Sequence, residues 1–487
     1  MAIEAPPITG PAVKKISLNF FAQATLSHMS PGQWRNPQDK GRNGDTLEQW
    51  VELAKLAERG KIAFIFLADQ YGGHDKYKGS LDTTVASGTG WPAMDPFMLV
   101  SAMAAVTKSL GFGLTASTSY ETPFALARRF STLDHLTRGR VAWNIVTSYS
   151  ASAARNMGQE SVIPHDERYA MAEEYMEIMY KLWETSWATD ALVHDKQGNM
   201  FTDPALVKHI VHEGKYMKMD GRFQVHPSPQ RTPLLFQAGT SSAGKAFAAR
   251  HAEAVYIGGL FPAQAVKSVR EIRAATAALG RDPKSIKFFA GMTPIIGRTT
   301  EEAQAKYEEM KKYVDPVAGL AMFSGFSGMD LSRFPLDEPF QLENKPGDNA
   351  VYSILDNFAK ASGTGSGKEW TPRMLGEKMA LGGLHPTPVG TASHVADVMQ
   401  QWIDECDVDG FNLSYVVMPG SFEDVVDLLR PELLRRGMVE EDYPLVGGTL
   451  RQNFYGGKDE SGRPLSSELR EDHPAKEYSR QRLSKET

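Results

Sequence analysis

The sequence has little of several features that mark special classes of protein. Its 487 residues include a single cysteine, Cys406, which excludes internal disulfides and multi-cysteine metal or iron–sulfur sites. The most apolar stretch, residues 97–106, is interrupted by Ser101 and is shorter than the roughly 20 residues that cross a bilayer. The amino terminus does not resemble a signal peptide, because no charged region precedes an apolar run. These absences predict a soluble, cytoplasmic protein without a membrane segment.

An excess of positive charge is also absent. Lys and Arg total 53 against 59 Asp and Glu, which gives a net charge of −6. A chain without a basic field has nothing to neutralise a phosphodiester backbone, so nucleic acid is not an expected partner. No repeat of fixed period occurs, which argues against a solenoid or propeller.

Apolar strand-like runs alternate with helical patterns along most of the chain. Continuous apolar strands separated by amphipathic helices are typical of parallel β/α architecture. Eight such units at this length favour a closed (β/α)8 TIM barrel over an open sheet. A helix after the first run is predicted to begin at Asp45 as its cap and to end at Gly60. The predicted strands are residues 16–21, 62–67, 110–116, 140–146, 234–237, 254–257, 286–290 and 411–417.

Two long segments interrupt this alternation, at about 185–231 and 314–388, after the fourth and seventh strands. We therefore predict one barrel domain, residues 1–437, with two insertions, followed by a carboxyl-terminal arm, residues 438–487. The arm wraps either the barrel or a partner subunit, and a homodimer or tetramer is expected. The second insertion is a candidate lid. Four of its residues either line an apolar pocket or form the lid's own core: Met322, Phe323, Phe326 and Met329.

Active sites of barrels form at the carboxyl ends of the strands, where this sequence has few charged residues. Asp69 is the exception, and it either caps a loop or accepts a hydrogen bond from a ligand. It has no acidic companion after the neighbouring strands, which argues against a glycosidase. His209 and His212 lie in an insertion without an obvious third ligand, so no metal site is predicted.

The segment GTSSAGK, residues 239–245, begins like a nucleotide-binding GxxxxGK[ST] loop, but Ala246 lacks the required hydroxyl. Ser241 and Ser242 nevertheless start a helix directly after a strand, where free N–H groups and hydroxyls suit a phosphate monoester. The alternative is that both serines are ordinary helix caps.

A second group of phosphate-binding candidates begins the helix that Pro164 opens. His165, Arg168 and Tyr169 share one face of its first turns. Three donors there suit a phosphate. The alternative is that Tyr169 continues the apolar stripe of this helix and that Arg168 pairs with a nearby acid.

These segments, taken in order, resemble the bacterial-luciferase-like flavin monooxygenases, in the branch of nitrilotriacetate monooxygenase component A and dibenzothiophene-sulfone monooxygenase. The resemblance spans most of the chain. It is carried by seven ordered segments: HMSPGQWRNP, FIFLADQYG, GLTASTSYETPFALARRFSTLDHLTRGRVAWNIVTS, PHDERYAMAEEYMEIMYKLW, LFQAGTSSAGKAFAARHAEAVY, SGMDLSRFPLDEP and GTASHVADVMQQWIDECDVDGFNL.

The resemblance implies a TIM barrel that binds reduced FMN (FMNH2) supplied by a separate NAD(P)H:flavin reductase. O2 would be captured as a flavin 4a-hydroperoxide that oxidises a small organic substrate beside a C–N, C–S or C–C bond. His28, with Trp34 and Arg35 behind it, is the implied catalytic residue and would manage protons over the flavin. The implied cofactor contacts are Asp69, Thr115, Asn144, His165, Tyr169, Ser241 and Ser242.

Two other functions remain open from the sequence. The chain is alternatively a luciferase-like flavin or deazaflavin oxidoreductase that does not activate O2, or a flavin-binding protein without turnover. Members of the family act on aminopolycarboxylates, aryl sulfones and similar compounds, and no residue selects among these substrates. The aromatic residues of the lid favour an apolar one.

Overall fold

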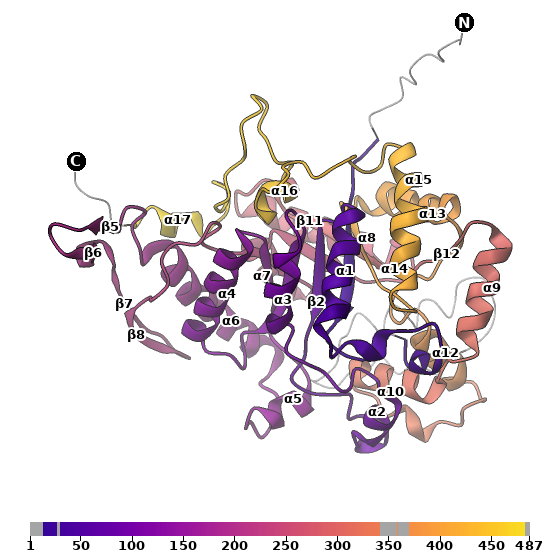
Figure 1. Cartoon of the computed structure of the whole chain (residues 1–487). Helices are drawn as coiled ribbons and strands as arrows, with labels where there is room; N and C mark the ends of the chain where they lie inside the picture. Colours follow the sequence, from indigo (N-terminus) through magenta and orange to yellow (C-terminus); the bar gives the residue numbers. More distant parts are fainter. Residues whose placement is uncertain (1–12, 27–29, 341–357, 359–369, 483–487) are drawn as a thin grey trace, which may run out of the picture.

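The core of the molecule is a closed barrel of eight parallel strands (Figure 1). The structure is a computed structural model, and it describes residues 13–26, 30–340, 358 and 370–482. β1 pairs with both β2 and β14, which closes the barrel in the order β1-β14-β11-β10-β9-β4-β3-β2. The predicted (β/α)8 fold is therefore confirmed. The barrel strands are β1 (Ser17–Gln23), β2 (Phe64–Ala68), β3 (Gly111–Ser117), β4 (Val141–Val146), β9 (Leu234–Gln237), β10 (Ala254–Ile257), β11 (Lys287–Met292) and β14 (Gly410–Leu413).

Alternate side chains of the strands fill the barrel and pack against the helices outside. Inside, the rings of Phe64 and Phe236 lie 5.0 Å apart, and Phe289 meets Phe64 edge to face. Outside, Trp143 of β4 packs against Phe130 and Trp183. Because both faces of each strand are buried, the strands read as apolar runs in the sequence.

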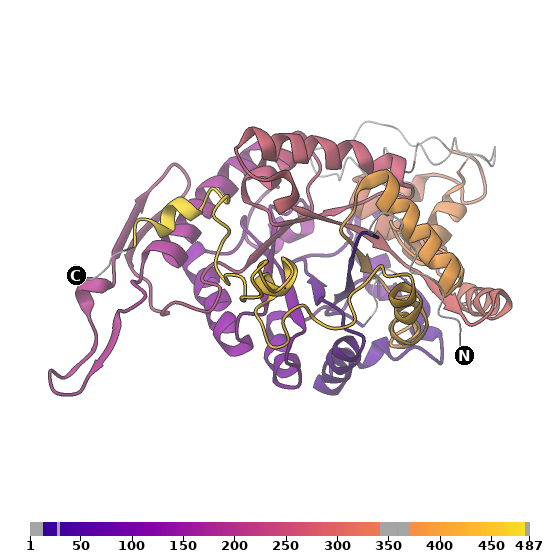
Figure 2. The ribbon, with the colours of Figure 1, turned by 90° about the horizontal axis from the view of Figure 1, so that it is seen from above.

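Helices surround the barrel and connect its strands (Figures 1 and 2). None of the helices in the described part of the chain is long and apolar enough to cross a membrane. The surrounding helices are α1 (Leu47–Arg59), α3 (Phe97–Ala105), α4 (Pro123–Thr137), α6 (His165–Tyr180), α7 (Ser242–His251), α8 (Pro262–Ala278), α13 (Ala392–Cys406), α14 (Gly420–Asp424) and α15 (Arg430–Arg435), and the short α2 (Asp82–Ser87) and α5 (Ala151–Asn156) lie in loops after β2 and β4.

The predicted start of α1 is wrong by one residue. Thr46, not Asp45, is the residue before the helix, and no side chain caps it. The chain enters α1 from a turn in which the Thr46 N–H and hydroxyl both donate to the carbonyl of Asn43, at 2.9 and 2.8 Å. This turn makes Thr46 the last extended residue. The predicted end at Gly60 is confirmed.

The two long segments between barrel units fold differently. Residues 185–231 form two hairpins, β5 (Leu192–Asp195) with β6 (Met200–Thr202) and β7 (His209–Glu213) with β8 (Lys218–Arg222), which project from one side of the molecule (Figure 1).

The second segment follows β12 (Ile295–Gly297) and α9 (Thr300–Lys311) and contains α10 (Pro316–Ser327) and α12 (Pro372–Ala380), after which β13 (Val389–Thr391) pairs with β12. A Cβ at Gly319 would collide with the carbonyl of Gly376, so these two glycines let α10 and α12 pack backbone to backbone.

The carboxyl-terminal segment crosses the end of the barrel opposite α5 and α10 (Figures 1 and 2). Its helix α16 (Leu450–Phe454) places Leu450 and Phe454 in one cluster with Phe64 and Phe289 from inside the barrel. A shorter helix, α17 (Lys476–Ser479), lies farther along. The described part of the predicted arm therefore packs on the chain's own barrel and seals its amino-terminal end.

Candidate functional site

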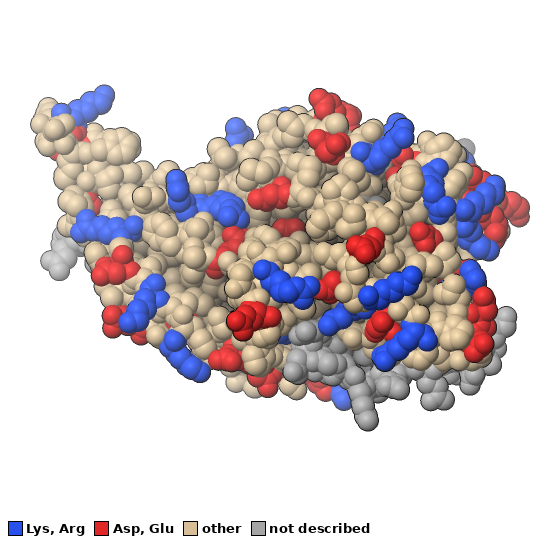
Figure 3. Space-filling view, turned by 90° about the horizontal axis from the view of Figure 1, so that it is seen from below, with Lys and Arg blue, Asp and Glu red and all other residues tan. Residues whose placement is uncertain are grey.

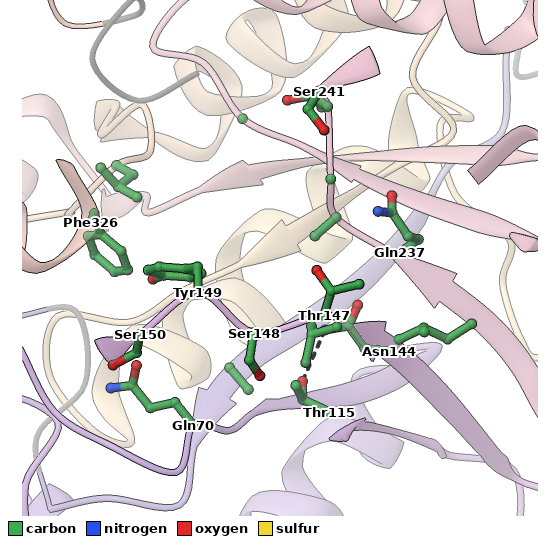
Figure 4. Close-up of a pocket in the computed structure, with 18 of the residues that line it drawn as sticks. Gln70, Thr115, Asn144, Thr147, Ser148, Tyr149, Ser150, Gln237, Ser241 and Phe326 are labelled. Atoms are coloured by element: carbon green, nitrogen blue, oxygen red, sulfur yellow. Dashed lines mark hydrogen bonds between the residues drawn. The ribbon is translucent and has the colours of Figure 1, made fainter. Parts of the chain in front are cut away.

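A cavity of about 800 Å³ opens at the carboxyl ends of the barrel strands (Figure 4). Its walls come from the ends of six strands, from the first turns of α6, α7 and α8, and from α10. Six of the residues predicted as cofactor contacts line it: Asp69, Thr115, Asn144, His165, Tyr169 and Ser241. Their roles stay predictions, but the structure brings them to one place.

One of the described site residues, Ser242, is not in this wall. Ser242 is the first residue of α7 and is exposed, outside the lining of the cavity. The strand-to-helix turn carries only one of the adjacent serines inward. His28 lies outside the described residues, so its catalytic role stays a prediction.

Ser241 occupies the N-cap of α7 and faces the cavity. Its Oγ accepts a hydrogen bond from the N–H of Gly244 at 3.1 Å, and the Ser241 hydroxyl also hydrogen-bonds with Tyr169. A Cβ at Gly239 would collide with the Tyr169 hydroxyl, and one at Gly244 would lie 2.8 Å from it. The two glycines thus let the turn approach Tyr169 closely and leave its backbone open to a ligand.

The first turns of α6 bring polar side chains to the same end of the cavity. Burial raises the pKa of Tyr169, while hydrogen bonding with Ser241, Thr147 and Gln237 opposes the rise. The rings of His165 and Tyr169 lie 5.2 Å apart, and the buried Arg168 donates to the carbonyl of Ile163 at 2.7 Å. A helix N-terminus, hydroxyls and a guanidinium together suit a phosphate.

Among the described residues, two buried amide oxygens in the barrel end of the cavity find no hydrogen-bond donor. Asn144 donates its Nδ2 to the Thr115 hydroxyl at 3.0 Å, but its Oδ1 accepts no hydrogen bond. The Oε1 of Gln237 is in the same condition. A buried acceptor without a donor carries a desolvation penalty, so these two oxygens are suited to receive N–H or O–H groups of a ligand.

Asp69 combines the two roles left open by the sequence. Its Oδ1 accepts from the N–H of Gln70 at 2.8 Å, so it does cap a loop, and it also lines the cavity. Burial raises the pKa of Asp69 from 3.8 to about 6, the Gln70 hydrogen bond opposes this, and the charges of Asp95 and Glu121 add to it. Near neutral pH, the cavity wall therefore holds a carboxylate with a destabilised negative charge.

This raised pKa makes the stability pH-dependent. Between pH about 4 and about 6 the folded protein binds more protons at Asp69 than the unfolded chain does, so folding loses stability as the pH rises. Asp69→Asn lacks this titration. We expect the melting temperature of the variant, relative to the unmodified protein, to increase as the pH is raised from about 4 to about 7. Thermal unfolding across this range checks it, and a constant difference would contradict the raised pKa.

His385 is a cavity residue that the sequence reasoning missed. Its ring lies against the backbone of β11, where a Cβ on Gly291 would collide with it, and 5.8 Å from the ring of Phe21. Burial lowers its pKa to about 4, so its imidazole is neutral. Lys378 of α12 holds the preceding turn by donating to the carbonyls of Gly383 and His385, at 3.2 and 2.8 Å. The only sequence signal was an isolated histidine in a long insertion.

The candidate lid residues divide between the two roles left open. Met322 and Phe326 of α10 line the cavity. Phe323 and Met329 are not among the residues that line the cavity. They pack with Leu320, Leu375 and Met379 in a buried cluster to which Met322 also belongs and against which Phe326 packs.

The histidine pair in the hairpins makes no metal centre. His209 contacts Asp220, and His212 contacts Glu174 at 3.3 Å and Lys181 at 3.1 Å. In the described ranges, no three His, Cys, Asp or Glu side chains are grouped so that they could hold a metal ion.

Comparison with known proteins agrees with this architecture. The family model described as luciferase-like monooxygenase matches residues 26–406. A dimethyl-sulfide monooxygenase of Hyphomicrobium sulfonivorans is 43% identical and covers 97% of this chain and 96% of its own. A long-chain alkane monooxygenase of Geobacillus thermodenitrificans is 42% identical over 91% of this chain and 94% of its own. Nitrilotriacetate monooxygenase component A of Aminobacter aminovorans is 34% identical over 91% and 97%.

Solved structures give the same result. The crystal structure of DmoA from Hyphomicrobium sulfonivorans has a TM-score of 0.87 at 43% identity and covers 96% of each chain. A riboflavin lyase solved with modified FMN and riboflavin has a TM-score of 0.84 at 35% identity, over 96% of this chain and 99% of its own. With a family model matched over most of its length and relatives this similar from end to end, the chain belongs to the luciferase-like monooxygenase family, and it is an enzyme, a flavin-dependent monooxygenase.

Proposed function

We propose that the chain uses reduced FMN and O2 to oxidise a small organic substrate beside a C–N, C–S or C–C bond. The observation that carries this proposal is the cavity itself, which joins a phosphate-type end to a barrel end with unpaired amide acceptors. One relative is a riboflavin lyase solved with modified FMN, and another is named as component A of its enzyme. The first name supports an FMN site here. The second supports a separate NAD(P)H:flavin reductase as the source of reduced flavin.

The residues that line the cavity fit both ends of FMN, its phosphate and its ring system. The phosphate is a dianion and needs several hydrogen-bond donors, such as those found at a helix N-terminus. It would be held by Ser241, Tyr169, His165 and Arg168. The flavin ring system carries N–H groups, which suit the unpaired oxygens of Asn144 and Gln237. Thr115 orients Asn144 through their hydrogen bond, and Asp69 is a further polar contact at the wall.

Reduced FMN, when bound, supplies the two electrons with which O2 is activated. The chain's own residues bind and orient the flavin and keep water from the reacting atoms. Asn144 and Gln237 are buried at the inner end of the cavity, and α10 forms one side of it through Met322 and Phe326. His28 stays our candidate for proton transfer.

A pair of neighbouring serines tests the phosphate site. Ser241→Ala removes a donor to the phosphate as well as the α7 cap, so we expect FMN to bind about tenfold to a hundredfold more weakly. Riboflavin, which lacks the phosphate, should bind almost as before. Equilibrium titrations of flavin fluorescence measure both affinities. Ser242→Ala is the matched control, since Ser242 is exposed, and should change neither.

Ser241→Asp separates the phosphate contact from the helix cap. Aspartate caps helices as well as serine does, but its charge repels phosphate. We expect normal stability with loss of FMN binding and retention of riboflavin binding. Equal losses of FMN and riboflavin affinity would contradict the assignment.

The oxygen chemistry needs its own test, which compares O2 consumption with product formation. A protein that binds FMN in both redox states but never couples O2 consumption to product would favour the alternatives that do not activate O2.

Two further expectations stay predictions. The first is a homodimer or tetramer, supported by the projecting hairpins, whose Phe201 is 67% exposed. The second is a cytoplasmic location.

A further inference from the structure

One side of the cavity is formed by α10, by the loops that follow β2 and β4, and by the turn after α12, which contributes Leu384. We call this side the α10 pocket, and it is lined by Tyr71, His74, Tyr149, Met322, Phe326 and Leu384. In the view of Figure 4, Phe326 and Tyr149 lie on the same side of the cavity, away from Gln237. These six side chains offer mainly aromatic, thioether and aliphatic surface, which is typical of a site for apolar ligands. Uncharged polar residues of the same loops, among them Gln70, Ser148 and Ser150, also line the cavity.

The polar atoms of the α10 pocket carry no positive charge. Tyr71 donates its hydroxyl to Glu121. Burial lowers the pKa of His74 to about 4, so its ring is neutral, and it packs edge to face on Phe326 with ring centroids 4.9 Å apart. A Cβ at Gly325 would collide with the His74 ring, which shows how closely α10 is packed on this loop. A histidine held in this way contributes apolar surface rather than charge.

The charged residue that lines the cavity beside the α10 pocket is an acid, Asp69, which follows β2. Its pKa shift shows that it interacts with Asp95 and Glu121, and Glu121 is itself paired with Arg129 at 2.9 Å, outside the lining of the cavity. Among the described residues that line the cavity, those from α10 and from the loops after β2 and β4 include no Lys or Arg. An anion bound there would be desolvated beside the Asp69 carboxylate and without a counter-ion among these lining residues.

The cations of the cavity belong to other elements. Arg168 comes from α6, beside the proposed phosphate contacts. Lys245 and Lys267 come from α7 and α8 and both pair with Glu271, at 2.5 and 3.8 Å. On the visible part of the face around the cavity, Lys and Arg are interspersed with Asp and Glu (Figure 3), so no surface of one sign gathers charged ligands towards it.

From this distribution we infer that the α10 pocket takes an uncharged, largely apolar substrate and rejects carboxylates. The inference rests on the proposed function, since it assigns the substrate class of the same site. It separates this chain from an enzyme for aminopolycarboxylates, whose substrate would need cations where this cavity has aromatic rings and Asp69.

Three ligands with one skeleton test the inference. The protein, saturated with oxidised FMN at pH about 8, where Asp69 is ionised, is titrated by calorimetry with butyl methyl sulfide, 4-(methylthio)butanoate and 3-(methylthio)propylammonium. We expect the neutral sulfide to bind at least about tenfold more tightly than either ion. Equal or tighter binding of the carboxylate or the ammonium would overturn the inference, as would failure of the sulfide to bind. Failure of FMN to bind would instead count against the proposed function.

A charge placed in the pocket gives the reciprocal test. Phe326→Arg should lower the preference for the sulfide over the carboxylate by at least about tenfold, because it adds the missing counter-ion. Phe201→Arg, on the exposed β6 hairpin, is the control and should leave the preference unchanged. An unchanged preference in folded Phe326→Arg would contradict the location. If that variant does not fold, the comparison of the three ligands on the unmodified protein decides by itself.

Discussion

Replacing Arg451 by methionine is expected to lower the free energy of unfolding by about 3–5 kcal/mol, as the removal of one partner from a buried ion pair does. Arg451 and Glu253 are each 1% exposed. Their side chains form two parallel hydrogen bonds, Nη2 to Oε2 at 2.7 Å and Nε to Oε1 at 2.8 Å. Methionine fills much of the volume but leaves the carboxylate of Glu253 buried without its counter-charge.

The same guanidinium ties the carboxyl-terminal segment to the barrel. Arg451 also donates to the carbonyls of Thr232 and Pro233, just before β9, and to that of Ser467 farther along the segment. Glu253 in turn accepts from the N–H of Leu235 at 3.1 Å. Loss of Arg451 therefore strips several buried acceptors of their donor as well.

Urea unfolding of the apoprotein measures this effect. Arg463→Ala, at an exposed position of the same segment, is the control and should stay within about 0.5 kcal/mol of the unmodified protein. The double variant Arg451→Met, Glu253→Gln should recover part of the loss, since it leaves no buried charge. A loss below about 1 kcal/mol for Arg451→Met would show that the segment is not anchored to the barrel in this way.

The ion pair also illustrates where sequence reasoning ends. The eight strands were predictable because parallel strands buried on both faces must be continuous apolar runs, as in Phe64–Ala68. Nothing local distinguishes Glu253 or Arg451 from the other charged residues, and they lie 198 positions apart. Their pairing exists only once the barrel has closed and α16 has been laid across it.

The site shows the same division between local and tertiary signals. The rule about strand ends pointed to Asp69 and Ser241, the family resemblance added Thr115, and the structure brings all three to one cavity. Gln237 was missed because it belongs to the strand itself, where the rule about strand ends does not apply, and His385 was missed because a long insertion returns it to β11. Ser242 looked equivalent to Ser241 in the sequence, and only the geometry of the turn distinguishes them.

Asn144→Leu is expected to change stability and flavin binding in opposite directions. The Oδ1 of Asn144 finds no donor among the described residues, and removing this unpaired oxygen should relieve a penalty of about 1–3 kcal/mol. Leucine also loses the hydrogen bond to Thr115, about 0.5–1.5 kcal/mol, so we expect the free energy of unfolding to rise by about 1 kcal/mol in all. FMN should bind about tenfold to a hundredfold more weakly, because the leucine offers no acceptor to the flavin. Urea unfolding and flavin fluorescence titration of the same preparation measure the two effects.

Asn19→Leu is the matched control for this result. Asn19 of β1 is also fully buried, with both amide atoms unpaired, but it does not line the cavity. It should therefore gain stability in the same way and keep its affinity for FMN. If Asn144→Leu destabilises the apoprotein, its amide serves the fold through Thr115. If the Asn144→Leu variant gains stability and still binds FMN normally, the unpaired oxygen of Asn144 is not a flavin contact. Only the combination of gained stability with lost binding shows that the fold tolerates an unpaired amide there for the sake of the cofactor.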